Sequence, residues 1–376
     1  MTAKNFVNFH VLMSHSPSCL NRDDMNMQKT AVFGGVNRVR ISSQSLKRAM
    51  RMSDYYHATL GVPSVRTRDL GKLKARFAEL LKDRFDGNLV GKALEWISGK
   101  EGIAEGVEAD AVAPWSVEEV AHFCELIHKG EQDTKKLEKQ IEKDARPFRE
   151  AMGKAADIAL SGRMATSGLM TSLPVDGAFA VAHAITTHAV EPQDVDWFTA
   201  VDDLTQDAGE TGAGHLDTQQ FSSGVFYRYA SLNMKQLQVN LGLVPNMKSA
   251  ETPESRKRAL EVATHVFHML ATVVPSAKQQ SFAAHNPADF AIVSFADQPI
   301  SLANAFEQPV KPAREGGFLH PSTQRLGEYW TRVNRAYGLS ENARAFAVGE
   351  EAKLGDKQAF ATLREIEAWI ENDGQA

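Results

Sequence analysis

Basic side chains are concentrated in one short stretch near the N-terminus of an acidic chain. Residues 22–51 hold seven basic and two acidic side chains, a net charge of +5, whereas the full 376 residues carry −5. Because lysine and arginine at a phosphate release condensed counterions, this block predicts a dedicated polyanion site. A solvated charged face is the alternative, and charge alone does not decide between the two. The basic residues are Arg22, Lys29, Arg38, Arg40, Lys47, Arg48 and Arg51.

A serine-capped helix is expected to position part of this block. Residues 38–41 alternate arginine with aliphatic side chains, as a β-strand does, and Ser42 and Ser43 are natural N-caps for a helix over residues 44–52. The basic residues of that helix stay on its outer face. The end of the strand, the free backbone N–H groups at the start of the helix and the helix dipole together favour the binding of a phosphate there.

The segment Ser161–Gly168 is a loop of small residues framed by glycines. Its glycines let the backbone approach a ligand closely, Arg163 and the hydroxyls can bond phosphates, and Met164 can wedge between bases. A tight turn between helices explains the glycines equally well.

Trp197 and Phe198 are adjacent aromatic residues within a polar, acidic segment over residues 191–221. Neighbours on a strand point in opposite directions, so one of the two rings is free to stack on a base, a contact worth roughly 1–3 kcal/mol. In the alternative interpretation, Trp197 anchors this segment to the rest of the protein.

Catalytic and metal patterns are weak. The Asp23-Asp24 pair could hold a divalent ion and position water for RNA cleavage, or the two could be salt-bridge partners of Arg22. The histidines and cysteine of residues 122–128 lack a clear third ligand, and no Gly-Lys-Ser/Thr follows Gly34-Gly35. We therefore expect no metal and no cofactor.

The elements that must position these residues alternate between strands and helices. Residues 6–13 read as a half-buried strand with Val7, Phe9, Val11 and Met13 on one face and polar residues on an open side. Further strands are expected at 224–230 and 290–295. Helices are expected through 66–160, including a Ser116 capping box, and at 254–273, 322–337 and 357–371. This order fits an α+β sheet domain of the ferredoxin-like kind, the architecture of RNA-recognition domains, with a helical insertion.

The composition is that of a globular protein, with 43% hydrophobic and 24% charged residues. No stretch approaches the length of a membrane span, and no signal pattern opens the chain. Cys19 and Cys124 are far apart, which favours a reduced compartment. We expect a cytoplasmic protein without membrane partners.

Several long segments follow the residue order of a known family: 10–12 and 15–29, 38–51, 158–168, 196–203 and 221–230. Over these segments the chain resembles the CasC family, the backbone subunit of the type I-E CRISPR Cascade complex. It departs from that pattern mainly at 207–214 and 243–254, which look longer.

The resemblance implies a hand-like protein. Its palm, a modified RNA-recognition fold, covers residues 1–59 and 224–376, with helical fingers at 60–190 and a thumb at 191–223. Copies of such a subunit form a helical filament along CRISPR RNA in antiviral defence. They grip its phosphates, kink it at regular intervals and leave bases free to pair with target DNA.

The resemblance also implies a noncatalytic protein whose partners are CRISPR RNA, target DNA through the guide, further copies of itself, other Cascade subunits and a separate helicase-nuclease. A metal-dependent RNA endonuclease using Asp23 and Asp24 is the alternative. By motif position, the predicted RNA contacts are Asn21, Arg22, Lys29, Ser42, Gln44, Lys47, Arg48, Arg51 and Arg163, with Met164 and Ser167 at the kink and Trp197, Phe198 and Thr199 on the thumb.

Overall fold

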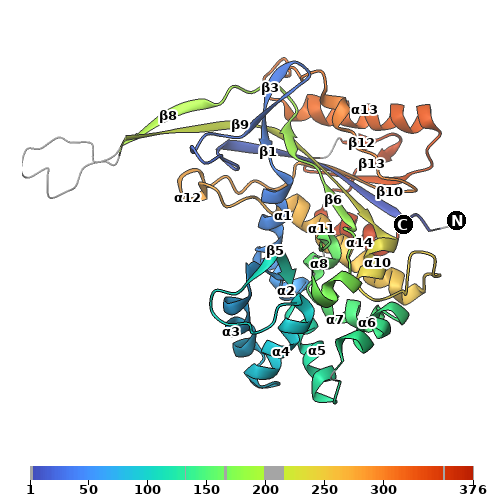
Figure 1. Cartoon of the computed structure of the whole chain (residues 1–376). Helices are drawn as coiled ribbons and strands as arrows, with labels where there is room; N and C mark the ends of the chain where they lie inside the picture. The colour runs from blue at the N-terminus through green and yellow to red at the C-terminus, as the bar shows by residue number, and fades with distance from the viewer. Residues whose placement is uncertain (1–2, 132, 165–166, 199–215, 350–351, 376) are drawn as a thin grey trace, which may run out of the picture.

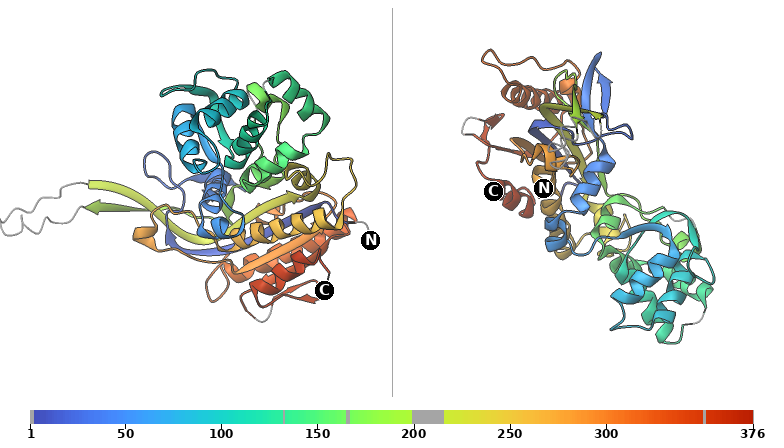
Figure 2. Two further views of the ribbon diagram at one scale, coloured as in Figure 1. Left: turned by 90° about the horizontal axis from the view of Figure 1, so that it is seen from below. Right: turned by 90° about the vertical axis from the view of Figure 1, so that its left-hand side faces the viewer.

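The protein is built from a sheet part, a helical part and a projecting two-stranded ribbon (Figures 1 and 2). The structure is a computed structural model that describes residues 3–131, 133–164, 167–198, 216–349 and 352–375. In Figure 1 the sheet part lies above, the helical part below, and the ribbon extends to the left. The α+β prediction is confirmed. Its RNA-recognition character remains a prediction.

One antiparallel sheet organises the sheet part. Its central strands are β1 (Phe6–Ser18) and β9 (Leu216–Asn233), which pair with Phe9 opposite Ala230. The sheet order is β11 (Asn342–Ala347), β10 (Phe290–Ala296), β1, β9, β7 (Ala184–Thr186), β3 (Val36–Ile41) and β2 (Thr30–Phe33), while β6 (Phe179–Val181) and β8 (Gln193–Phe198) also pair with β9.

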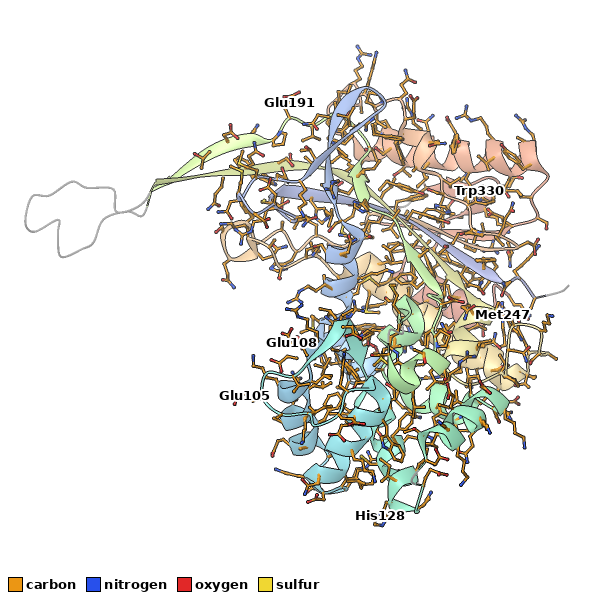
Figure 3. All side chains as sticks on the ribbon, in the orientation of Figure 1. Glu105, Glu108, His128, Glu191, Met247 and Trp330 are labelled. Carbon is orange, nitrogen blue, oxygen red and sulfur yellow. The ribbon has the colours of Figure 1, made fainter. Side chains whose placement is uncertain are left out.

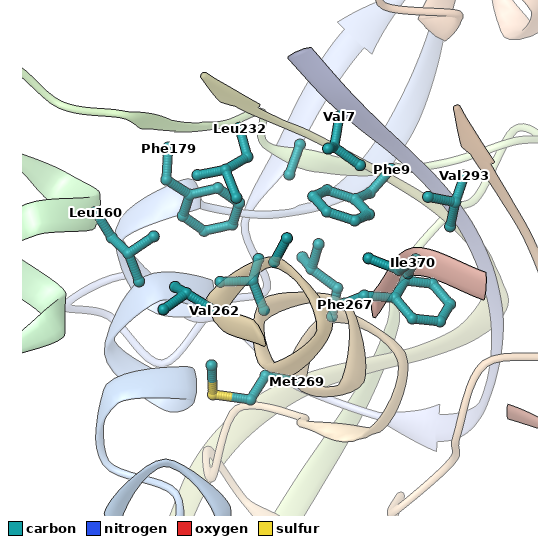
Figure 4. Close-up of a cluster of buried hydrophobic side chains, with 14 of the residues drawn as sticks. Val7, Phe9, Leu160, Phe179, Leu232, Val262, Phe267, Met269, Val293 and Ile370 are labelled. Carbon is teal, nitrogen blue, oxygen red and sulfur yellow. The ribbon is translucent and has the colours of Figure 1, made fainter. Parts of the chain in front are cut away.

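The first face of the sheet packs on the long helix α11 (Pro253–Thr272) and on α14 (Leu363–Glu371) (Figure 4). Val7, Phe9, Val11 and Met13 all point into this core, as their alternation predicts. The prediction of α11 is also confirmed. Its N-terminus forms a capping box between Thr252 and Ser255.

The second face of the sheet is covered too, and the prediction of an open polar side was wrong. Asn8 and His10 are buried beneath η2 (Ala303–Phe306) and α13 (Leu319–Tyr337). They are tolerated because they are hydrogen-bonded: His10 Nδ1 lies 2.8 Å from the Tyr227 hydroxyl, and the Tyr229 hydroxyl donates to Asn8 Oδ1 at 3.1 Å.

The helical part has its own core, in which Phe77, Trp115 and Phe123 are fully buried. It is entered from the sheet through α1 (Ser43–Arg51) and α2 (Asp54–Thr59) and left after residue 173, while α8 (Ala156–Ser161) also packs on the core beneath the sheet. Its elements are β4 (Val65–Asp69), α3 (Leu70–Leu80), α4 (Gly87–Ser98), β5 (Glu108–Trp115), α5 (Val117–His128), α6 (Thr134–Lys143), α7 (Arg146–Gly153) and η1 (Gly168–Ser172).

Two details of the predicted organisation need correction. The strands β6 and β7 pair with β9 in the main sheet, although the helical insertion was expected to continue to residue 190. The predicted capping box at the start of α5 does not form: the Ser116 hydroxyl makes no cap hydrogen bond and points to the Ala151 carbonyl at 3.5 Å, and the Glu119 side chain is bound to Arg163.

The remaining elements lie at the edges of the sheet part. They are α10 (Met234–Asn240), α12 (Gln279–Phe282), β12 (Lys353–Leu354) and β13 (Lys357–Gln358). The segment 243–254 follows α10, and Figure 3 shows its Met247 at the side of the molecule opposite the ribbon. Residues 207–214 lie outside the described residues. Both cysteines are buried free thiols.

Candidate nucleic-acid interface

The polar loop between β1 and β2 is tied to the start of α1 by Asn21. Its side-chain Oδ1 accepts from the Ser42 backbone N–H at 2.8 Å, and its backbone carbonyl accepts from the Lys29 N–H at 2.9 Å. The half-buried Asn21 therefore holds the loop against the helix.

Asp23 shapes the same loop. Its Oδ1 accepts from the backbone N–H groups of Met25 and Met27, each at 2.9 Å, while Asp24 is exposed. Arg22 is exposed beside this turn, and its guanidinium donates to Asn26 Oδ1. One carboxylate oxygen of Asp23 is thus used in an internal turn.

The serine cap of α1 forms as predicted. The Ser42 hydroxyl accepts from the Ser45 backbone N–H at 3.3 Å, and no acidic side chain occupies the first turn. Gln44 and Arg48 are exposed on the outer face of the helix, and Lys47 is half-buried. Figure 1 shows α1 between the sheet part and the helical part.

Lys47, Arg51 and Arg66 form a cluster of cations, here the Lys47 cluster. The Lys47 ammonium donates to the Phe179 carbonyl at 3.1 Å, and the Arg51 guanidinium donates to the Ser64 carbonyl at 3.0 Å. Burial lowers the pKa of both Lys47 and Arg51, and the positive charge of Arg66 lowers each pKa further. An approaching anion would relieve this repulsion.

One carboxylate lies beside the Lys47 cluster. Asp157 is buried, accepts from the Ser64 N–H at 2.8 Å and the Ser64 hydroxyl at 2.6 Å, and lies 3.5 Å from an Arg66 nitrogen. Its one negative charge does not balance three cations, so the cluster keeps a positive excess.

A second basic group, the Arg40 cluster, consists of the cations Lys29 and Arg40 together with His183. Arg40 Nε donates to the Thr30 carbonyl at 3.0 Å, and its NH1 lies 3.1 Å from His183 Nδ1. Since arginine only donates, His183 Nδ1 accepts and the ring is neutral. Burial lowers the His183 pKa, and Arg40 and Lys29 lower it further.

Sequence reasoning missed Arg66 and His183 because β4 and the turn before β7 bring them in from outside the 22–51 block. The Arg66-x-Arg68 alternation in β4 was the one local signal for Arg66.

Arg38 does not belong to the exposed basic surface. It is fully buried, and its guanidinium donates to the carbonyls of Thr186 and Phe306 at 2.9 Å each and of Phe33 at 3.3 Å. This arginine fixes the β2–β3 hairpin to the sheet.

The predicted phosphate contact through the Arg163 side chain does not fit the structure. Its guanidinium is completely buried and donates to both oxygens of Glu119, at 2.7 and 2.8 Å. A guanidinium bound in this way inside the helical part is a structural group.

Met164, the next residue, is almost fully exposed at 86%. It borders a hollow of about 580 Å³ that is also lined by Ser161, Gly162, Pro174 and Gly177. Ser167 is half-buried on the same loop. The loop thus presents a free apolar side chain at the edge of a hollow, which suits the predicted wedge.

The ribbon carries the predicted aromatic pair. Trp197 and Phe198 are the last residues of β8, where they pair with Asp217 and Leu216 of β9. Thr199 lies outside the described residues. The pair thus lies in β8 of the ribbon, and its exposure and contacts remain a prediction.

The described residues hold no group of three or more His, Cys, Asp or Glu side chains placed to bind a metal ion. None of the helices in the described part of the chain has the length and hydropathy needed to cross a membrane.

An antiparallel sheet with an inserted helical part, a projecting ribbon and two local clusters of basic side chains defines a mixed α+β protein. The chain belongs to the CT1975-like protein family of Cas proteins, whose pattern it matches over residues 7–372.

Two solved structures share this fold over nearly the whole chain. A chain of a "CRISPR RNA-guided surveillance complex, pre-nicking" is 25% identical with a TM-score of 0.74, covering 98% of this chain and 100% of that one. A chain of a "CRISPR RNA-guided surveillance complex" is 22% identical with a TM-score of 0.58, covering 98% and 99%. No curated protein sequence matches.

Proposed function

We propose that this protein is a noncatalytic subunit of a type I-E Cascade complex and binds the phosphates of CRISPR RNA. Family membership and the likeness to a chain of an RNA-guided surveillance complex support a Cascade-type role. The main support for RNA binding comes from the Lys47 cluster and the Arg40 cluster. In each of them, neighbouring positive charges lower the pKa of a basic side chain.

Phosphate contacts suit a protein that must accept any guide sequence. Cations and backbone N–H groups grip phosphates without reading bases, so base pairing supplies the specificity. In this proposal Arg22, Lys29, Lys47, Arg48 and Arg51 bind the RNA backbone. Asn21 and Ser42 shape the surface, and the exposed Gln44 adds a polar contact.

Assembly and kinking extend the proposal. Copies of the chain line up along the guide, the ribbon of one copy reaches the next, and Met164 with Ser167 and residues 197–199 displace a nucleotide at each junction. The intervening bases then pair with target DNA. The exposed Met164 beside its hollow supports this role. Other Cascade subunits and a separate helicase-nuclease complete the system.

The turn geometry of Asp23 supports a structural role over a nuclease role, because two backbone donors use one of its oxygens. Incubating the assembled complex with Mg²⁺ and complementary RNA tests this directly. Cleavage that disappears in Asp23→Ala and Asp24→Ala would overturn the noncatalytic proposal.

The binding test uses the double variant Lys47→Ala/Arg51→Ala. We expect weaker binding to single-stranded RNA. The slope of log K against log salt concentration should also become shallower, by about 0.7 for each phosphate contact that the variant loses. Undiminished binding with an unchanged slope would show that the RNA lies elsewhere. Lys311→Ala, an exposed lysine outside both cation clusters, is the control.

A further inference from the structure

Residues 273–286, the first part of the connection between α11 and β10, form a loop that is hydrogen-bonded at both ends. The buried Arg228 of β9 donates to the carbonyls of Leu270 and Val273, at 3.2 and 2.9 Å, where α11 ends. At the other end, Asn286 Oδ1 accepts from the Ser16 backbone N–H at 3.4 Å. The loop therefore has a defined place beside the end of β1.

The same loop contains two strained residues. Lys278 has φ +55° and Ala283 has φ +48°, so both are in the left-handed region that a side chain makes unfavourable. Between them lies α12, whose Gln279 side chain donates to the carbonyls of Pro275 and Ala284 at 3.1 and 3.3 Å. Such strain persists only where the surroundings impose it, and it is frequent at functional sites.

The loop also touches the base of the ribbon. The Phe282 ring packs on Phe221 of β9 with 5.7 Å between ring centroids. Figure 1 and the left view of Figure 2 both show α12 beside the point where β8 and β9 leave the sheet. The loop that contains α12 therefore contacts both the end of β1 and the base of the ribbon.

Lys278 is the cation that this loop presents. It is half-buried, and among the described residues no carboxylate lies within ion-pair distance of it. The positive charge of Lys278 acts on Cys19, the first residue after β1. Burial raises the pKa of the Cys19 thiol, while the charges of Arg22 and Lys278 both lower it. Lys278 and Arg22 thus act on one small region, although 256 positions separate them in the chain.

We infer that Lys278 is a further phosphate contact for single-stranded RNA, placed at the base of the ribbon by a strained backbone. Glycine would be less strained at position 278, yet the residue there is a lysine, and its ammonium has no ion-pair partner in the described part of the chain. The loop that carries it contacts the end of β1 through Asn286 and the base of the ribbon through Phe282. This extends the basic surface from α1 past the β1–β2 loop toward the ribbon. The inference rests on the proposed RNA-binding function.

Substitution at Lys278 separates strain from charge. Lys278→Gly and Lys278→Asn both remove the cation, and both residues tolerate the left-handed region. We expect Lys278→Gly to raise the melting temperature by a few degrees. Both variants should bind single-stranded RNA roughly three- to tenfold more weakly, with a salt slope shallower by about 0.7. Stability and binding then change in opposite directions.

Two controls complete the test. Ala283→Gly relieves the same kind of strain in the same loop without a charge change, so it should bind RNA like the wild type. Lys278→Arg keeps the charge and should retain the wild-type salt slope. Binding is measured with the full chain and a fluorescently labelled RNA of mixed sequence between about 50 and 200 mM salt.

The outcomes distinguish this inference from the function on which it rests. If Lys278→Asn binds with wild-type affinity and slope while Lys47→Ala/Arg51→Ala is impaired, the inference is wrong and RNA binding stands. If the wild-type chain binds no RNA at all, both fail. If Ala283→Gly loses binding as Lys278→Gly does, loop conformation and not the cation is responsible, and the inference is again wrong.

Discussion

The guanidinium of Arg163 and the carboxylate of Glu119 form a two-hydrogen-bond ion pair that is completely buried between the end of α8 and α5. The pair joins the Met164 loop to the interior of the helical part. It places the loop without itself reaching the surface. The stability of the fold and the position of the exposed Met164 are therefore linked.

Breaking this pair should destabilise the protein strongly. Glu119→Ala leaves a buried guanidinium without its partner, and we expect a loss of about 3–5 kcal/mol in the free energy of unfolding, measured by urea denaturation. Glu118→Ala on the same helix removes an exposed pair with Arg84 and should cost less than about 1 kcal/mol. Equal losses in the two variants would contradict the structural role of Glu119.

Arg66 should contribute to RNA binding although it lies outside the N-terminal basic block. Arg66→Ala removes one cation of the Lys47 cluster, so the salt slope should become shallower by about 0.7. Arg68→Ala is the matched control, because Arg68 lies on the same strand, pairs with Glu108 at 3.1 Å and is not part of the Lys47 cluster. If Arg68→Ala has the larger effect, the RNA lies nearer the Arg68 end of β4 than the Lys47 cluster.

Gly34 should be required at the tip of the β2–β3 hairpin. A Cβ there would overlap the Glu307 carbonyl oxygen, whereas a Cβ on Gly35 would meet nothing within 4 Å. Both glycines have positive φ, so Gly35→Ala should lower the free energy of unfolding by about 1 kcal/mol through backbone strain alone. Gly34→Ala adds the overlap with Glu307 and should lower it by at least about 2 kcal/mol more. Thermal unfolding of the two variants measures the difference, and equal melting temperatures would refute the close contact.

Acid should destabilise the sheet part through its buried histidines. Burial lowers the pKa of both His10 and His15 from 6.5 to about 3. The unfolded chain therefore binds more protons below pH 6.5, and stability falls as pH falls from 6.5 toward 3. Between pH 6.5 and 5 each histidine should lower the free energy of unfolding by about 2 kcal/mol.

Replacing His10 provides the check on that pH dependence. His10→Gln keeps a hydrogen-bonding group beside Tyr227 but cannot take up a proton in this range. Urea denaturation across the pH series should give a shallower slope for the variant, whatever its stability at neutral pH. An unchanged slope would mean that other groups cause the acid sensitivity.

Local signals explain what the sequence predicted well. The serine cap and the apolar positions of α1 lie within ten consecutive residues, so helix and cap follow from the local pattern. The expected outer face holds only for Arg48, because Lys47 and Arg51 are half-buried against the carbonyls of Phe179 and Ser64. The alternation of β1 likewise predicted which side chains face α11. The covered second face was missed, because Asn8 and His10 look like surface residues until their tyrosine partners, more than 200 positions away, are known.

The candidate site depends more on topology. Arg163 was assigned to a phosphate because its partner Glu119 lies 44 positions earlier and had another predicted role. Arg66, His183 and Lys278 each come from a separate segment, and no local pattern joins them to the block at 22–51. Pairing of distant strands and the end of α11 bring them to the basic surface.

The most direct test of the central claim is the nucleic-acid content of the assembly purified from its native cells. We predict a 260/280 nm absorbance ratio typical of a protein–RNA complex, RNA of defined length, and a lower RNA content in Lys47→Ala/Arg51→Ala. An assembly that forms normally and contains no RNA would contradict the account.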